Sequence, residues 1–204
     1  MAAEIFIARH GQNQDNANHI LNGRRDLPLT ETGRKQAKDL AMGIKEVGLE
    51  FEAIYSSPLQ RAHETAKIIC RTLGIRIDPI VLPSLIERDF GVMTGVDQSK
   101  VEEMCAPNII KTDTVTYFLN PEGAETFPEL VKRGHNALEE VRSRHDTENV
   151  LLVCHGDIGK MIYASATNKP WDDVLRDFHF GNGDLIEVSP NDDAHKIKLP
   201  QHNL

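Results

Sequence analysis

Two histidine–glycine pairs, each directly after an apolar run, are the part of this sequence best suited to chemistry. Arg9-His10-Gly11 follows the run Ile5–Ala8, and His155-Gly156 follows Val150–Cys154. In open α/β sheets ligands bind beyond the carboxyl ends of the strands, so two such strands would bring both imidazoles to one edge. A neutral imidazole is a nucleophile, and an arginine fork matches phosphate oxygens. The pattern therefore predicts phosphoryl transfer through histidine.

The two histidines would take different parts in that reaction. His10 needs an unprotonated nitrogen to attack phosphorus, and the guanidinium of Arg9 beside it disfavours the imidazolium form. His155 can donate a hydrogen bond to the equatorial phosphate oxygens, and Gly156 leaves room for a backbone amide to help. A lone histidine in a loop is more often a hydrogen-bonded structural residue. The repetition at two strand ends is what favours a catalytic interpretation here.

Three further charged residues are candidates for the same site. Arg61 lies on the first turn of an expected helix after the strand 52–56, where free N–H groups and the helix dipole favour anions. Taken alone, an arginine there is more often a solvated charge, but its strand should end on the same edge as His10. Glu87 and Asp89 are competing carboxylates, one of which would protonate the leaving oxygen and later accept a proton from water. Spacing alone does not choose between them.

The elements that must position these residues alternate between strand and helix. This alternation predicts an α/β fold with three layers, in which a mostly parallel central sheet is flanked by helices. Helix caps and period 3.6 mark the helices, with Thr30 and Thr126 as N-caps, Pro58 at a first helical position, and Gly48 and Gly74 as stops. The expected strands are 4–8, 52–56, 75–80, 150–154 and 185–188, and the expected helices are 31–47, 58–73, 97–105, 127–141 and 157–166.

The length of 204 residues fits a single domain, 1–204. Its least regular stretch, about 81–123, is expected to be an insert over the carboxyl edge of the sheet that shapes the substrate pocket, and 191–204 is expected to be a polar tail. Substrate selectivity would then lie in that insert and in the loop after His10. Gln12, Gly23, Arg24 and Arg88 are the candidate contacts with the rest of the substrate.

Composition narrows the possible partners. The net charge of −8 makes a general nucleic-acid binder a poor interpretation. No apolar run approaches the length of a membrane span, and no signal peptide is expected before the first strand. The three cysteines are widely spaced and odd in number, which favours reduced thiols in a cytoplasmic protein over a zinc site or a disulfide framework. A monomer or a homodimer is expected.

Taken together, these motifs resemble the histidine phosphatase superfamily, also called the phosphoglycerate mutase-like family, and in particular its phosphatase branch. The resemblance spans roughly residues 4–189. Four motifs occur in the family's order and at similar separations, which is far more specific than Arg-His-Gly alone. The four motifs are Arg9-His10-Gly11 with Asn16 six residues after the histidine, Ser56–Ala66 with Arg61, Glu87 four residues before Gly91, and His155-Gly156. In addition, Leu29–Ala37 is similar to the family's segment after the first loop.

The resemblance implies a phosphoglycerate mutase-like fold and a reaction that needs no metal and no cofactor. His10 would attack a phosphate monoester to form a phosphohistidine, and Glu87 would protonate the leaving oxygen. Water would then release inorganic phosphate. The phosphoryl oxygens would be held by Arg9, Asn16, Arg61, His155 and Gly156.

Two departures from the family pattern bear on the activity. Gln12-Asn13 replaces the usual Glu-Thr or Glu-Ser after the first motif. The cofactor-dependent mutases also carry a lysine and an arginine pair, whereas this chain has Gln98 at the lysine position and no arginine pair in 111–115. The second difference weakens the mutase interpretation without excluding it, because Glu87-Arg88 and Phe90-Gly91 resemble the mutase form of the acid motif. The favoured interpretation is a phosphomonoesterase acting on a small phosphorylated metabolite. The alternatives are a phosphoglycerate mutase, which would need 2,3-bisphosphoglycerate, and a non-catalytic module that binds a phosphorylated ligand.

Overall fold

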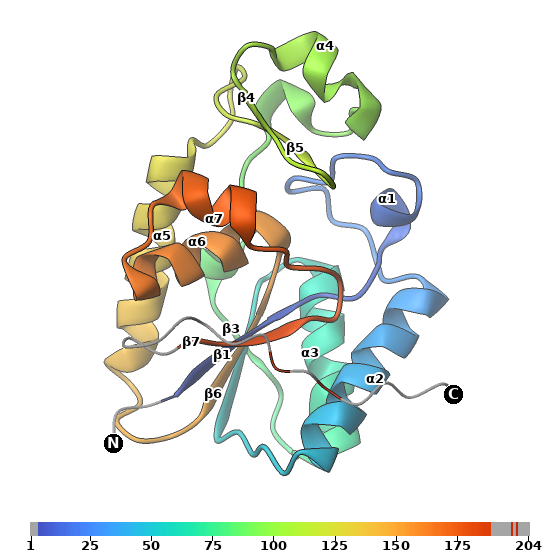
Figure 1. Ribbon diagram of the computed structural model, residues 1–204. Coiled ribbons are helices and arrows are strands. Elements are labelled where there is room, and N and C mark those ends of the chain that lie inside the picture. Colours follow the sequence, from blue (N-terminus) through green and yellow to red (C-terminus); the bar gives the residue numbers. More distant parts are fainter. Residues whose placement is uncertain (1–3, 189–196, 198, 200–204) are drawn as a thin grey trace.

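The computed structural model describes residues 4–188, 197 and 199, and a five-stranded sheet lies at its centre (Figure 1). The strand order is β3-β2-β6-β1-β7. Both β1 and β2 pair in parallel with β6, and β3 pairs in parallel with β2, while β7 runs antiparallel to β1. The predicted mostly parallel sheet is therefore confirmed. The strands are Ile5–Arg9 (β1), Ala53–Ser56 (β2), Ile80–Val81 (β3), Val150–Cys154 (β6) and Leu185–Val188 (β7).

The register of the three middle strands brings their carboxyl ends level with one another. Val153 of β6 pairs with Ala8 of β1 on one side and with Ser56 of β2 on the other. The residues that follow these strands therefore emerge at the same edge of the sheet. All five residues of β6 are fully buried, as the unbroken apolar run of a central parallel strand predicts.

Helices cover both faces of the sheet and complete three layers. In β1, Phe6 and Ala8 pack toward α2 and α3, whereas Ile5 and Ile7 pack toward α5, α6 and α7. Figure 1 shows α5 and α6 on the opposite side of the sheet from α2 and α3. The helices are Gln14–Ala17 (α1), Glu31–Glu46 (α2), Gln60–Leu73 (α3), Val101–Cys105 (α4), Phe127–Arg142 (α5), Gly156–Thr167 (α6) and Trp171–Asp177 (α7).

Local capping signals predict most helix boundaries correctly. Thr30 caps α2 by accepting from the Gly33 amide, and Thr126 forms a reciprocal capping box with Glu129 at the start of α5. Gly74 ends α3 in the left-handed conformation, with φ of +76°. These three boundaries depend on atoms within a few residues of one another, which is why the sequence reveals them.

Two predicted elements are wrong. Helix α3 begins at Gln60, with Leu59 as an N-cap that makes no side-chain cap bond, so Pro58 is not its first helical residue. The strand expected at 75–80 shrinks to Ile80–Val81, two exposed residues at the outer edge of the sheet. Residues 76–78 are exposed, so this apolar alternation does not face the core.

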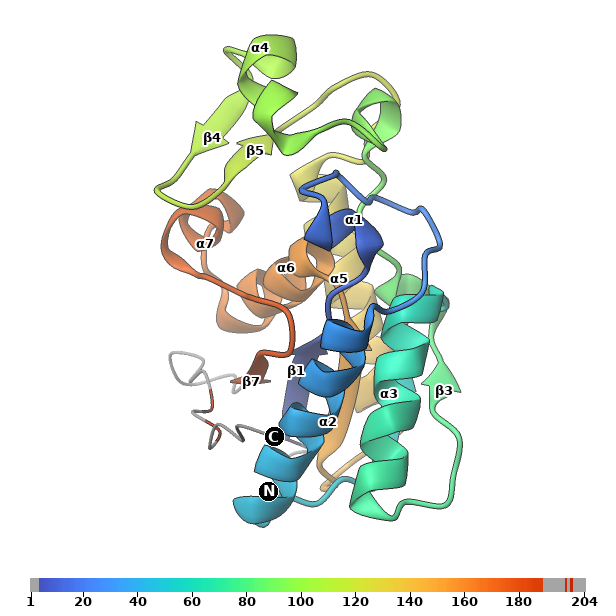
Figure 2. The same cartoon turned by 90° about the vertical axis from the view of Figure 1, so that its right-hand side faces the viewer.

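The segment 81–123 carries its own small elements above the carboxyl ends of the strands (Figure 1, Figure 2). It contains three 3₁₀ turns, Pro83–Leu85, Gly91–Met93 and Gln98–Lys100, then α4 and an antiparallel hairpin of β4 (Ile109–Lys111) and β5 (Thr116–Phe118). A separate apolar cluster that includes Phe90 and Phe118 holds it together. The sequence analysis predicts neither this hairpin nor α7. The predicted polar tail lies outside the described residues except for Ile197 and Leu199.

Candidate active site

His10 follows β1 directly and is almost completely buried, with 2% of its surface exposed. Its Nδ1 lies 2.6 Å from the carbonyl oxygen of Gly11. Because a carbonyl can only accept, Nδ1 carries the hydrogen and the lone pair of a neutral ring is on Nε2. Burial, followed by the charges of Arg61 and Arg9, holds the pKa of His10 well below its usual value. The ring is therefore neutral, with its nucleophilic nitrogen 3.1 Å from Arg61 Nε.

Gly11 is required by the packing of the loop that carries His10. A Cβ atom at Gly11 would lie 2.2 Å from the carbonyl oxygen of Gly33, near the start of α2. Only glycine allows the two backbones to approach this closely. The glycine of the first motif thus lets α2 seat the catalytic loop.

Two arginines face the same space as His10. Arg61 is fully buried, and carbonyl oxygens of Gly23 and Arg25 accept from its two Nη atoms at 2.9 and 2.6 Å. Burial lowers the pKa of Arg61 to about 10, which leaves it cationic at neutral pH. Arg9 donates from Nη1 to the Phe180 carbonyl at 2.7 Å, while its buried Nε has no protein partner in the described part of the chain. Backbone carbonyls therefore fix both guanidinium groups while adding no negative charge.

His155 follows β6 and packs edge-to-face against His10, with ring centroids 5.0 Å apart. Its Nε2 lies 2.7 Å from the hydroxyl of Ser57, which follows β2. Its Nδ1 is buried with no partner among the described residues. Burial and the nearby Arg61 hold the pKa of His155 well below its usual value. The ring is neutral, so its one N–H must be on the correct nitrogen to reach a phosphate.

The structure favours Glu87 over Asp89 as the acid. The Glu87 carboxyl lies at the amino terminus of α6, where it accepts from the amides of Asp157 at 3.3 Å and Ile158 at 3.2 Å. Burial, followed by the Asp157 carboxylate, raises the pKa of Glu87. Asp89 instead pairs with Arg24 at 3.1 Å and does not line the cavity.

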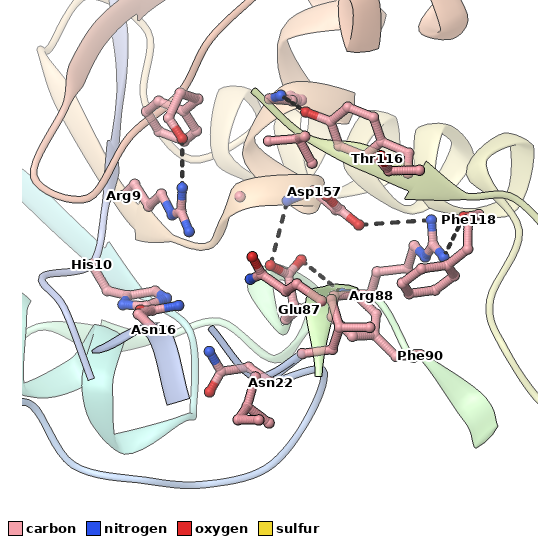
Figure 3. A pocket seen from close by; sticks show the side chains of 18 of the residues that line it. Arg9, His10, Asn16, Asn22, Glu87, Arg88, Phe90, Thr116, Phe118 and Asp157 are labelled. Atoms are coloured by element: carbon pink, nitrogen blue, oxygen red, sulfur yellow. Dashed lines mark hydrogen bonds and ion pairs between the residues drawn. The ribbon is translucent and has the colours of Figure 1, made fainter. Parts of the chain in front are cut away.

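A cavity of about 160 Å³ is lined by Arg9, His10, Arg61 and Glu87, whereas His155 packs against His10 and does not line it. Figure 3 shows Arg9, His10 and Glu87 around the same space, with Glu87 between Asp157 and Arg88. The wall of the cavity includes side chains from β1, α1, α3, the segment 81–123 and α6. The predicted site residues that line it are Arg9, His10, Asn16, Arg61, Glu87, Arg88 and Gly156.

Three predicted substrate contacts do not line the cavity: Gln12, Gly23 and Arg24. Gln12 accepts from the Thr30 hydroxyl, and Gly23 supports Arg61 through its carbonyl. Arg24 pairs with two carboxylates on the outside of the site. The polar groups of these three residues thus already have hydrogen-bond or ion-pair partners within the protein. The fourth predicted contact, Arg88, does line the cavity and is 1% exposed.

The sequence analysis misses several residues that the fold brings to the site. Ser57 supports His155, and Asn182 donates both to the His10 carbonyl at 2.8 Å and to the Asn16 side chain at 3.3 Å. Lys160 and Tyr117 form a buried pair on the cavity wall. Only Lys160 carried a local signal, since it lies one helical turn after Gly156.

Other kinds of site find no support in the described part of the chain. Residues 4–188, 197 and 199 contain no group of three or more His, Cys, Asp or Glu side chains placed to hold a metal ion. Within the same residues no helix is both long and apolar enough to cross a bilayer.

The family follows from sequence comparison. Residues 5–203 match the profile of the histidine phosphatase superfamily (branch 1). The chain belongs to this superfamily. A metal-independent phosphoserine phosphatase of Arabidopsis thaliana is 32% identical over 173 residues, or 80% of this chain and 68% of the relative. A 2,3-bisphosphoglycerate-dependent phosphoglycerate mutase of Parvibaculum lavamentivorans is 32% identical over 156 residues, or 75% of this chain and 74% of the relative.

Solved structures share the fold of this histidine phosphatase superfamily member. YhfR of Bacillus stearothermophilus superposes with a TM-score of 0.76 at 27% identity and covers 96% of this chain and 95% of its own. A mycobacterial glucosyl-3-phosphoglycerate phosphatase in complex with VO3 gives a TM-score of 0.74 at 21% identity, with 91% and 92% covered. These likenesses establish the phosphoglycerate mutase-like architecture, and the activity of this chain is argued below from its site.

Proposed function

We propose that this chain is a metal-independent phosphomonoesterase that hydrolyses a small phosphorylated metabolite through a phosphohistidine. The observation that carries the proposal is the neutral His10, whose Nε2 carries the lone pair and accepts from Arg61 Nε, in a cavity that also contains a carboxyl group with a raised pKa. Nucleophile, anion cradle and acid are the three parts that this reaction requires. The cavity of about 160 Å³ suits a small substrate.

The first chemical step transfers the phosphoryl group to the enzyme. His10 Nε2 forms a bond to phosphorus as the ester P–O bond breaks, and the Glu87 proton goes to the leaving alcohol oxygen. Arg9 and Arg61 balance the charge of the phosphoryl oxygens, while Asn16 and the N–H of His155 complete the cradle. Backbone carbonyls hold Arg9 and Arg61, and Ser57 holds His155. Because these phosphate-binding groups are already fixed, little rearrangement is needed at the moment of reaction.

The second step regenerates the enzyme. Water attacks phosphorus and its proton passes to the Glu87 carboxylate, while the P–N bond breaks and its electron pair returns to His10. Inorganic phosphate leaves, and both residues recover their starting protonation states. In this scheme Arg9 and Arg61 supply the positive charge that a metal ion supplies in other phosphatases.

Hydrolysis is favoured over the mutase reaction by what lines the cavity away from the phosphate. Gln98 lies at the position where the family's mutases carry a lysine, and Val115 and Thr116 line the wall near the expected arginine pair. The cations that would hold a bisphosphorylated intermediate at those positions are therefore missing. A phosphoserine phosphatase and a phosphoglycerate mutase are both 32% identical to this chain, so the choice rests on the cavity lining. Incubation with 3-phosphoglycerate and a trace of 2,3-bisphosphoglycerate distinguishes the reactions, since a phosphatase yields free phosphate and a mutase yields 2-phosphoglycerate.

The substitution His10→Ala tests the nucleophile. We expect it to abolish phosphate release from an aryl phosphate and from a metabolite panel, together with the acid-labile phosphoenzyme trapped by rapid quenching. His135→Ala, an exposed histidine on α5, is the matched control and should retain full activity. Full activity in the His10 variant would refute the assignment. A wild-type protein that binds phosphorylated compounds but releases no phosphate would instead support the non-catalytic binding module.

A further inference from the structure

Lys160 is a buried cation on the cavity wall without a carboxylate partner. It lies on α6, is 5% exposed, and its Nζ donates to the Tyr117 hydroxyl and lies 4.8 Å from the centre of that ring. No carboxylate oxygen of the described residues forms an ion pair with it within 4.0 Å. Burial lowers the pKa of Lys160 to about 8, so it remains charged at neutral pH. Lysine is almost never buried without a counter-charge. The carboxylate with the largest effect on Lys160 is Asp157, which raises its pKa but forms no ion pair with it and pairs instead with Arg88.

Apart from Lys160, the positive and negative charges around the cavity balance once a phosphate monoester is bound. Arg9 and Arg61 together match a bound phosphate monoester, which carries between one and two negative charges near neutral pH. Arg88 lies 3.7 Å from the Asp157 carboxylate, and Glu87 is uncharged when it is ready to act as the acid. One positive charge therefore remains after the phosphate has bound.

The position of Lys160 places this charge beside the leaving group. The amides of Asp157 and Ile158 hold the Glu87 carboxyl, which must reach the ester oxygen. Lys160 is three residues beyond Asp157, on the same side of α6 and about 4.5 Å farther along its axis. Lys160 and Glu87 also line the same cavity, so a leaving alcohol that receives the Glu87 proton shares this cavity with the ammonium group.

We propose that Lys160, positioned by Tyr117, binds a carboxylate on the leaving alcohol and so selects phosphorylated hydroxy acids as substrates. A single ammonium group matches a single small anion, and the cavity of about 160 Å³ must also hold the phosphoryl group. Lys160 lies on α6, the helix that follows His155. The lysine of the mutases corresponds to a different position, which is Gln98 in this chain. The inference rests on the proposed function, because it assumes that phosphate binds at His10.

Binding of two matched phosphonates tests the inference without turnover. 3-Phosphonopropionate and propylphosphonate differ only in a carboxylate that replaces a methyl group. We expect calorimetry to show about tenfold tighter binding of the carboxylate compound, the contribution of one charge-assisted hydrogen bond. Lys160→Met should reduce this ratio to within about twofold. The control Lys132→Met, at an exposed lysine on α5, should leave it at the wild-type value. A wild-type ratio near one, or a ratio retained in Lys160→Met, would overturn the inference.

Kinetics separates this inference from the proposed function. The ratio of kcat/KM for 3-phosphoglycerate to that for glycerol 3-phosphate should favour the acid about tenfold in the wild type. Lys160→Arg should retain part of that preference, and Tyr117→Phe, which removes only the positioning hydroxyl, should weaken it. Equal hydrolysis of both esters would leave the phosphatase in place and refute the role of Lys160. Selective phosphonate binding without phosphate release would refute the phosphatase and support the subsite.

Discussion

The Ser57 hydroxyl is the protein partner of His155 Nε2, and its removal is a direct test of the phosphate cradle. The Ser57 oxygen accepts from the Leu59 amide at 3.3 Å and lies 2.7 Å from His155 Nε2. We expect the hydroxyl to donate to Nε2, because the ring hydrogen is then on Nδ1, which has no protein partner among the described residues and can bind a phosphate oxygen. Since His155 is neutral, Nδ1–H is its only donor for a phosphate oxygen. Ser57→Ala removes this hydrogen bond while leaving the ring in place.

The expected effect on activity can be bounded from comparable changes. Loss of an outer hydrogen bond that orients a ligating histidine typically costs about 10- to 100-fold in affinity or activity. Removal of a whole oxyanion donor costs about 10²- to 10³-fold in kcat. Because Ser57→Ala retains the donor and loses only its orientation, we expect kcat/KM to fall by about 10- to 100-fold, or ~1.4–2.7 kcal/mol of transition-state stabilisation.

The same change also destabilises the fold. It removes the partner of His155 Nε2 and of the Leu59 amide, and each buried group left unpaired costs about 1–3 kcal/mol of the free energy of unfolding. For a protein of this size the melting temperature should fall by roughly 2–4 °C for each kcal/mol. Assays are therefore made well below the measured melting temperature of the variant, where they report on the reaction.

The assay measures phosphate release and the size of the phosphoenzyme burst, with melting temperatures recorded for each variant. Ser143→Ala, at an exposed serine whose hydroxyl bonds the Glu140 carbonyl, is the control and should match the wild type in kcat/KM. A folded Ser57→Ala enzyme within twofold of the wild type would show that the orientation of His155 does not limit the reaction.

Two further predictions concern the acid and the metal. Glu87→Gln should slow hydrolysis of alkyl esters by about 10²- to 10⁴-fold but affect an aryl phosphate much less, because its leaving group needs little protonation; equal slowing would contradict the assignment. In the wild type, kcat/KM for alkyl esters should fall as pH rises through the raised pKa of Glu87, and the variant should lack this limb. EDTA should leave the activity unchanged, and a loss that a divalent ion restores would refute metal independence.

Most of the elements could be predicted because their signals are local. The apolar run Val150–Cys154 specifies a buried central strand, and Thr30 and Thr126 satisfy amides only three residues away. The start of α3 was not predictable in this way. Ser57 precedes Pro58 as an N-cap would, and its hydroxyl does accept from the Leu59 amide, but it also bonds His155, which is 98 residues distant. A pattern read along the chain contains no information on that competing partner.

The sequence by itself determined the superfamily, the mostly parallel sheet and the placement of His10 near a histidine distant in sequence. It could do so because the ends of the strands and the order of the motifs follow from local sequence patterns. Tertiary structure decided what surrounds those residues. It placed Glu87 at the start of α6 on the cavity wall and Asp89 against Arg24 outside it. It also buried Lys160 beside Tyr117, a residue of the segment above the sheet. The protonation and the accessibility of these groups depend on neighbours far away in sequence, and only the packed fold brings those neighbours together.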